Sequence, residues 1–245
     1  EMCIRDSIGT GPFKFVRWDR DDKIVLEANE EYWGGKPSLK RLIFRVIPDN
    51  SARLMNLKKG MIHIMDMPNP DDIASIREDE NIVLLEETGI NIGYVAMNME
   101  KKPFDNLKVR LAINHAINKK SIVDNLYKGL GIVAKNPIPP TMWGYNDEIE
   151  DFEYNPELAK QLLAEAGYPD GFDTTLWVMP NPRPYFLTPD RIGVAIQSDL
   201  KKVGINARIE KREWGKYLEE LRNGKHDMAM LGWSADYVDP DNFLY

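Results

Sequence analysis

The chain has 245 residues, which is enough for a buried core and two lobes. It is 43% hydrophobic and 29% charged, an ordinary balance for a soluble globular protein. A net charge of −7 without a block of Lys or Arg argues against nucleic-acid binding. No apolar run approaches the roughly 18 residues of a membrane span. The single cysteine, Cys3, provides neither a disulfide framework nor a metal-thiolate site.

Both ends of the sequence look unlike the ends of a complete protein. Residues 1–7, EMCIRDS, lack the apolar segment of a signal peptide and fit no element, so we interpret them as non-native sequence. The other end stops at Tyr245, directly after a strand and loop, with no expected terminal element. We therefore expect a fragment of a longer protein.

The first part of the chain alternates short strands with two helices. Apolar–polar alternation predicts strands at 13–18, 23–28 and 39–47, and short apolar runs predict strands at 62–65 and 82–85. A helix is expected to open at Pro48 to Ser51 and to run to Lys59, where Gly60 closes it. A second helix is expected from the cap pair Asn69-Pro70 to about Glu78.

The character of the sequence changes near Thr88-Gly89, after which strands and helices alternate at βα spacing. The expected strands are 93–97, 175–179, 205–209 and 227–231, and the expected helices are 106–117, 118–127, 155–167, 189–203 and 214–222. This order predicts an α/β unit with a mixed sheet. Ligands of such sheets bind outside the strand ends, often beside helix N-termini.

Two strand ends carry the candidate site. The apolar run 228–231 is expected to turn at Gly232 into the polar loop that holds Asp236. The strand 175–179 delivers a second loop, PNPRPYFLTP, with Arg183 in it. We expect these loops to face each other and to hold a small zwitterion, Arg183 its carboxylate and Asp236 its amine.

Several stretches together carry a family resemblance. They are GTGPFKF (9–15), EYWGGKP (31–37), PFDNLKVRLAINHAI (103–117), NPIPPTMWGYN (136–146), AKQLLAEAGYPDGF (159–172), NPRPY (181–185), EWGKYL (213–218) and GWSADYVDPDNF (232–243). They run through nearly the whole chain after residue 8. With them the chain resembles the extracytoplasmic solute-binding proteins of peptide-importing ABC transporters, and within these the dipeptide-binding subgroup.

The resemblance implies an α/β, two-lobed fold like that of type II periplasmic binding proteins, with mixed sheets and incomplete at both ends. Residues 8–87 would be part of the first lobe (domain I) and residues 88–245 most of the second (domain III). The signal sequence and the C-terminal segment would be missing. The lobes are expected to close on the ligand like a hinge.

The same resemblance implies a role for each candidate site residue. In dipeptide binders an Arg in a motif like NPRPY, here Arg183, holds the peptide carboxylate, and an Asp in a motif like GWSAD, here Asp236, holds the amine. Trp233, Ser234 and Tyr185 are candidates for lining the pocket, as is Trp143, although core packing explains the aromatic residues equally well. The chain departs from the subgroup's pattern at PYFLTP and DYVDPDN, beside both proposed contacts.

Other interpretations remain open. Arg183 and Asp236 also fit a solvated loop arginine and a turn former, and the same fold serves binders of oligopeptides, glutathione, haem or nickel complexes. An α/β hydrolase has only Ser234 in its favour, in a motif that misses the last glycine of a nucleophile elbow. His63, His115 and His226 lie far apart in sequence, so no metal site is expected.

The resulting hypothesis is a monomeric, non-enzymatic solute-binding protein without a cofactor. It would deliver dipeptides to inner-membrane ABC permease subunits from the periplasm, or as a lipid-anchored protein on the outer face of a Gram-positive membrane.

Overall fold

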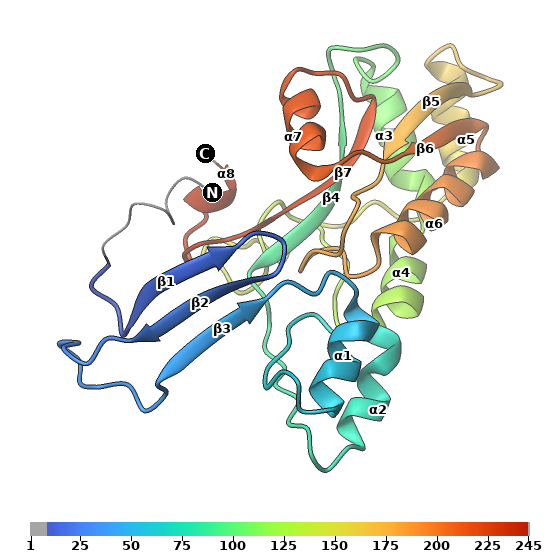
Figure 1. Ribbon diagram of the computed structural model, residues 1–245. Helices are drawn as coiled ribbons and strands as arrows, with labels where there is room; N and C mark the ends of the chain where they lie inside the picture. The colour runs from blue at the N-terminus through green and yellow to red at the C-terminus, as the bar shows by residue number, and fades with distance from the viewer. Residues whose placement is uncertain (1–8, 245) are drawn as a thin grey trace. The chain divides into compact units, whose positions relative to one another are not determined.

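The computed structural model describes residues 9–244, which form two compact units (Figure 1). One unit reaches to Met65 and the other starts at Asp66. This division of the chain differs from the predicted lobes, 8–87 and 88–245, which stay a prediction. The interpretation of residues 1–7 as non-native lies outside the described residues.

The first unit is an antiparallel sheet followed by a helix. The strands β1 (Phe13–Asp19), β2 (Lys23–Ala28) and β3 (Arg41–Arg45) lie in the order β1-β2-β3. Helix α1 (Asn50–Lys58) begins where the sequence predicts, because the Asp49 side chain accepts a hydrogen bond from the backbone N–H of Ala52 at 2.7 Å. Phe15, Val16, Ile43 and Phe44 of this sheet are exposed, and Val25 is its buried apolar residue.

The second unit contains the predicted mixed sheet. Its strands are β4 (Asn91–Met97), β5 (Phe172–Trp177), β6 (Ile205–Glu210) and β7 (Met228–Ser234), in the order β4-β7-β5-β6. Strand β5 runs parallel to both β6 and β7, whereas β4 runs antiparallel to β7. The carboxyl ends of β5 and β7 therefore lie at the same edge of the sheet.

The helices of the second unit, all except α8, occur close to where the sequence predicts them. They are η2 (Pro70–Asp72), α2 (Ile73–Arg77), α3 (Leu107–Ala116), α4 (Lys119–Ile122), the π-helical turn η3 (Val123–Tyr127), α5 (Pro156–Glu165), α6 (Pro189–Lys202), α7 (Trp214–Arg222) and α8 (Asp241–Leu244). None of the helices within residues 9–244 combines the length and the apolar character needed to span a bilayer.

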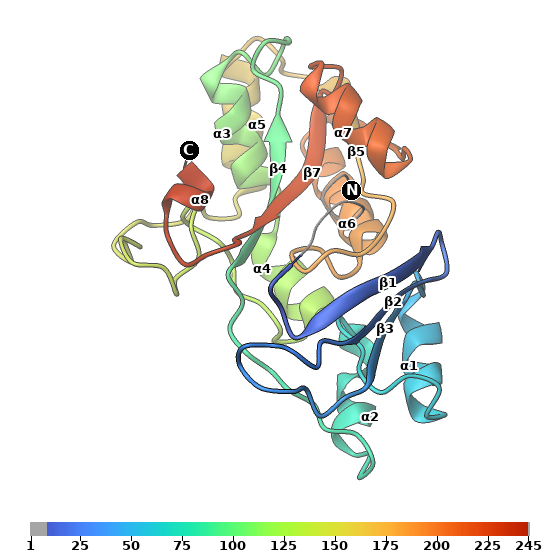
Figure 2. The same cartoon turned by 60° about the vertical axis from the view of Figure 1, so that its left-hand side comes forward.

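Helices cover both faces of this sheet, as Figures 1 and 2 show. Trp177 at the end of β5 contacts Tyr217 of α7, with ring centroids 5.6 Å apart. A Cβ added to Gly193 of α6 would lie 2.5 Å from Val178, the residue after Trp177. Because consecutive residues of an extended chain point to opposite sides, α6 and α7 lie on opposite faces. The buried core lies between this sheet and the helices that cover it, and it includes Leu176, Met228 and Met230.

Four expectations about elements are wrong. Residues 62–65 and 82–85 are coil, not strands, and Ile64 and Val83 are 87% and 83% exposed. Strand β7 does not stop at Gly232 but continues to Ser234, because β4 pairs with it along its whole length. The loop after it leads into a terminal element, α8, which the sequence analysis did not expect.

Candidate functional site

Trp233 and Ser234 lie on β7 and not in the loop where the sequence analysis placed them. They pair with Ile92 and Asn91 of β4, and the backbone N–H of Ala235 still donates to the carbonyl of Ile90 at 2.9 Å. Neighbouring residues of a strand point to opposite faces, so Trp233 and Ser234 cannot line the same side of a pocket.

The loop that carries Arg183 is a tight turn at the end of β5. Arg183 and Phe186 exchange two backbone hydrogen bonds of 3.0 and 2.9 Å, which fixes Pro184 and Tyr185 between them. The carbonyl of Tyr185 also accepts a 2.7 Å hydrogen bond from the Tyr127 hydroxyl. Burial raises the pKa of both the Tyr127 and the Tyr185 phenols, which moves their ionisation further above neutral pH.

Two paired glycines bring this turn onto the sheet. Gly93 of β4 and Gly232 of β7 lie opposite each other. A Cβ added to Gly232 would come within 2.2 Å of the Tyr185 ring, and one added to Gly93 would come within 2.9 Å of the Tyr185 carbonyl oxygen. Tyr185 therefore rests directly on β7, the strand that leads into the Asp236 loop. A glycine within a strand is a sequence signal for such a close approach.

The Arg183 guanidinium has an aromatic partner but no acidic one among residues 9–244. Its Cζ lies 4.2 Å from the centroid of the Trp214 ring, at the start of α7. Its Nε is buried without a hydrogen-bond partner. Such a donor is costly to leave unsatisfied. The arrangement presents a positive, fork-shaped donor that matches a carboxylate.

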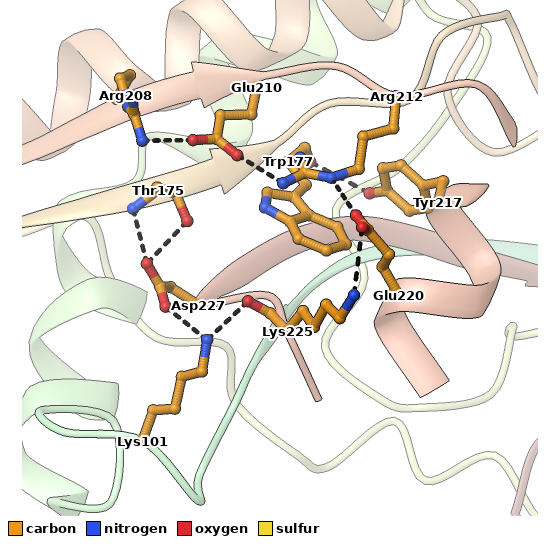
Figure 3. A network of polar contacts seen from close by, with 10 residues as sticks. All are labelled: Lys101, Thr175, Trp177, Arg208, Glu210, Arg212, Tyr217, Glu220, Lys225 and Asp227. Atoms are coloured by element: carbon orange, nitrogen blue, oxygen red, sulfur yellow. Dashed lines mark hydrogen bonds and ion pairs between the residues drawn. The ribbon is translucent and has the colours of Figure 1, made fainter. Parts of the chain in front are cut away.

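Arg212, in the same unit, is an arginine whose charge is paired with carboxylates of the protein itself. Its guanidinium stacks on Trp177 at 3.6 Å and forms ion pairs of 2.8 Å with Glu210 and 2.6 Å with Glu220 (Figure 3). Its charge is therefore neutralised within the fold. Arg183 shares the aromatic contact and lacks the carboxylates.

Asp236 lies in an exposed loop that Asn242 holds in place. The side-chain oxygen of Asn242 accepts hydrogen bonds from Trp233 Nε1 at 2.7 Å and from the backbone N–H of Asp236 at 3.2 Å. Within the described part of the chain, the Asp236 carboxylate itself has no hydrogen-bond or ion-pair partner. Sequence reasoning assigned no role to Asn242, although it lies in the stretch after β7, or to Trp214, which lies outside both strand-end loops.

Ser234 and the histidines weighed in the sequence analysis form no catalytic or metal-binding group within residues 9–244. Ser234 has no histidine partner there: His115 contacts the carbonyl of Glu153, and His226 packs against Trp177. No cluster of His, Cys, Asp and Glu able to hold a metal ion occurs in the same range. Trp143 is 66% exposed.

Comparison with known proteins identifies clear relatives. Residues 4–245 match the family described as bacterial extracellular solute-binding proteins, family 5, middle. The chain is 47% identical to the dipeptide-binding protein of Escherichia coli (strain K12) over 100% of this chain and 46% of that protein. It is also 45% identical to heme-binding protein A of Haemophilus influenzae, over 97% of this chain and 43% of that protein.

Solved structures agree with these sequence relatives. The ABC transporter-associated periplasmic binding protein DppA from Helicobacter pylori, in complex with peptide STSA, matches with a TM-score of 0.90 and 43% identity. That match covers 97% of this chain and 45% of the solved chain. The predicted fold class, the α/β fold of type II periplasmic binding proteins, is thereby confirmed. The chain spans just under half the length of the curated relatives described above.

Proposed function

Because the chain belongs to the bacterial extracellular solute-binding proteins of family 5, we propose that it serves an ABC importer by binding dipeptides through both charged termini. Arg183 takes the peptide carboxylate and Asp236 takes the amine. The protein carries out no chemistry of its own. Its partners are the peptide and the permease subunits in the inner membrane, and its place is the outer side of that membrane, free in the periplasm or lipid-anchored.

The observation that carries this proposal is the state of Arg183. A half-buried guanidinium that stacks on Trp214, has a buried Nε with no partner and meets no carboxylate in residues 9–244 has capacity left for an anion. A peptide C-terminus is the anion that the relatives' names favour: the Escherichia coli relative is called a dipeptide-binding protein. Asp236, on the loop after β7, supplies the opposite charge for the amine.

Clamping the termini explains how one site accepts many dipeptides. Their side chains differ, whereas every unblocked dipeptide carries one ammonium and one carboxylate. Exposed ion pairs contribute only about 0–1 kcal/mol each, so closure of the lobes must exclude water for the clamp to hold the ligand firmly. Tyr185 and Ser234 lie beside the clamp and remain our candidates for pocket-lining residues, and Trp233 is a candidate on the other face of β7.

The test is calorimetric titration of the full-length protein with Ala-Ala, N-acetyl-Ala-Ala and Ala-Ala amide. Clamping of both termini predicts firm binding of Ala-Ala and strong loss with either blocked form. Arg183→Ala should cost about 2–5 kcal/mol of binding free energy, because it leaves the ligand's carboxylate without its partner. Arg208→Ala is the matched control, since Arg208 is an exposed arginine paired with Glu210 at 2.5 Å. Equal affinity for the blocked and unblocked peptides would refute the proposal.

Haem is a second candidate ligand, because heme-binding protein A of Haemophilus influenzae is nearly as similar to this chain as the dipeptide binder is. The two ligands give different signals. Haem binding shifts the haem absorption spectrum, whereas dipeptide binding leaves it unchanged. Titration with haem in the presence and absence of Ala-Ala decides which ligand the protein takes and whether the two compete.

A further inference from the structure

Five side chains form a continuous row from Arg212, whose guanidinium is paired with two carboxylates, to Arg183, whose guanidinium has no acidic partner among residues 9–244. Arg212 lies 3.6 Å from the Trp177 ring centroid, Trp177 lies 5.6 Å from Tyr217, Tyr217 lies 5.4 Å from Trp214, and Trp214 lies 4.2 Å from the Arg183 Cζ. The row links β5, α7 and the loops after β5 and β6. We call it the cation–aromatic row. Figure 3 shows its Arg212, Trp177 and Tyr217 end.

The centre of the row is rigid. Tyr217 is fully buried, and its hydroxyl lies 2.8 Å from the carbonyl oxygen of Met230 and 3.2 Å from that of Trp177. These contacts hold α7 against β5 and β7 at once. The Tyr217 ring stacks on Trp214 with an interplanar angle of 23°. Any displacement of the Trp214 indole would therefore disturb a fully buried neighbour.

The start of α7 is also fixed. The Glu213 carboxylate caps the helix by accepting from the backbone N–H groups of Gly215 at 2.9 Å and Lys216 at 3.1 Å. These hydrogen bonds hold the pKa of Glu213 below its usual value. Trp214, the first residue of the helix, is thus held by its backbone as well as by its ring.

We propose that Trp214 is the positioning residue for Arg183, a role that rests on the proposed function of Arg183 as the carboxylate binder. The Arg183 Cζ lies over the indole at 4.2 Å from the ring centroid, and an aromatic ring does not neutralise the guanidinium. The N–H donors of Arg183 meet no carboxylate among residues 9–244, so they stay available to a ligand. Arg183 is then oriented before the peptide arrives, which lowers the entropy cost of binding.

The contrast within the row supports this role. At the Arg212 end, Glu210 and Glu220 occupy the guanidinium donors and the stack completes a structural ion-pair network. At the Arg183 end, the same kind of stack leaves the donors without a carboxylate among residues 9–244. A stack that served only packing would not need to leave a buried Nε unpartnered.

The experiment compares Trp214→Leu and Trp214→Phe with the unchanged full-length protein, by calorimetry with Ala-Ala and Ala-Ala amide. Loss of a cation–π contact corresponds to about 2- to 30-fold, so Trp214→Leu should weaken Ala-Ala binding by that factor. Binding of the amide should change much less, because the amide lacks the charge that Arg183 holds. Trp214→Phe keeps a ring under the guanidinium and should restore most of the affinity.

Trp18→Leu is the matched control, because Trp18 also lies under an arginine, Arg20 at 5.8 Å, in the first unit. It should leave the ratio of acid to amide affinity unchanged. If Trp214→Leu does not fold, Trp214→Phe carries the test through a smaller but still acid-specific loss. Equal weakening of acid and amide by a folded Trp214 variant would mean that Trp214 has only a packing role, and would overturn the proposal.

A double-mutant cycle separates this inference from the function on which it rests. If Trp214 acts through Arg183, Trp214→Leu should cause no further loss of Ala-Ala affinity in an Arg183→Ala background. An undiminished further loss overturns the positioning role while leaving the carboxylate role of Arg183 intact. A failure of the proposed function is recognised earlier, because the unchanged protein would then bind Ala-Ala and its amide equally well, and that result overturns the positioning role too.

Discussion

Replacing Gly232 with alanine tests the packing that holds the Arg183 loop on the sheet. The added Cβ would lie 2.2 Å from Tyr185 Cδ2 and 2.5 Å from the backbone carbonyl oxygen of Ile92. Since carbon atoms pack at about 3.5 Å or more, the Tyr185 ring must move by roughly 1.3 Å, and the carbonyl clash then still remains. Overpacking of this kind costs about 1–3 kcal/mol of folding stability.

The displacement also reaches the ligand site. Tyr185 and Arg183 belong to the same tight turn, so a shift of the Tyr185 ring moves the guanidinium away from Trp214. We therefore expect Gly232→Ala to lower both the free energy of unfolding, measured by urea denaturation, and the affinity for Ala-Ala, measured by calorimetry. Gly131→Ala is the control, because its added carbon would meet no atom nearer than 3.4 Å.

A second substitution identifies the clash responsible. Tyr185→Ala removes the ring, so Gly232→Ala should cost less stability in that background than in the unchanged protein, although the contact with the Ile92 carbonyl persists. If Gly232→Ala left both stability and affinity at their original values, the Tyr185 ring would not lie on β7, and the packing of the Arg183 turn on the sheet would be wrong.

Three further predictions concern single groups. Asp236→Asn should weaken binding of Ala-Ala by tenfold or more but leave N-acetyl-Ala-Ala unaffected, as calorimetry will show; equal losses would contradict the amine role. Tyr217→Phe should cost about 1–3 kcal/mol in urea unfolding, because the buried carbonyl of Met230 loses its donor; no change would contradict that contact. Burial and the nearby Lys101 ammonium lower the pKa of His226, so unfolding takes up a proton below pH 6.5 and stability should fall from pH 7 to 5.5. His226→Leu should flatten that part of the pH profile of urea unfolding, and an unchanged slope would rule out His226 as its cause.

The helices were predictable because their signals are local. Asn106 and Asn155 precede helices whose first turns their side chains cap, with hydrogen bonds of 2.9 Å to Lys108 N and 3.0 Å to Leu158 N. Such a cap is determined within a few residues, so no knowledge of the rest of the fold is needed. The parallel strands β5 and β6 were also found, since a buried strand between two helices has a recognisable apolar run.

Strands that depend on a partner were harder to predict. The runs 62–65 and 82–85 have strand-like composition, yet both are coil in the structure. A short apolar run becomes a strand only when a neighbour completes its backbone hydrogen bonds. The converse error occurred at Gly232, where a residue typical of turns lies inside β7 because Gly93 of β4 pairs with it.

The candidate site was only partly predictable for the same reason. Arg183 and Asp236 follow strands that are parallel neighbours, as the predicted α/β sheet requires, whereas their juxtaposition stays a prediction. Trp214 reaches Arg183 from the start of α7, an element remote from that strand end in sequence, and no periodicity or motif spacing encodes such a contact. Asn242 lies only 6 residues from Asp236 and 9 from Trp233, but no motif marks it as their hydrogen-bond partner. The glycines at 93 and 232 did carry a signal, since glycine inside a strand indicates close approach of another segment.

The two arginines of the second unit that lie over a tryptophan differ in one property, which distinguishes a structural arginine from a candidate ligand-binding one. Arg183 and Arg212 both lie over a tryptophan, at 4.2 and 3.6 Å, so stacking alone does not distinguish them. The carboxylates distinguish them: Glu210 and Glu220 form ion pairs with Arg212, and no described acidic residue forms an ion pair with Arg183. An aromatic face orients a guanidinium without neutralising it. A positioned charge that the fold leaves uncompensated is what a binder of small anionic groups requires, and for this reason we propose Arg183 as the residue that binds the ligand's carboxylate.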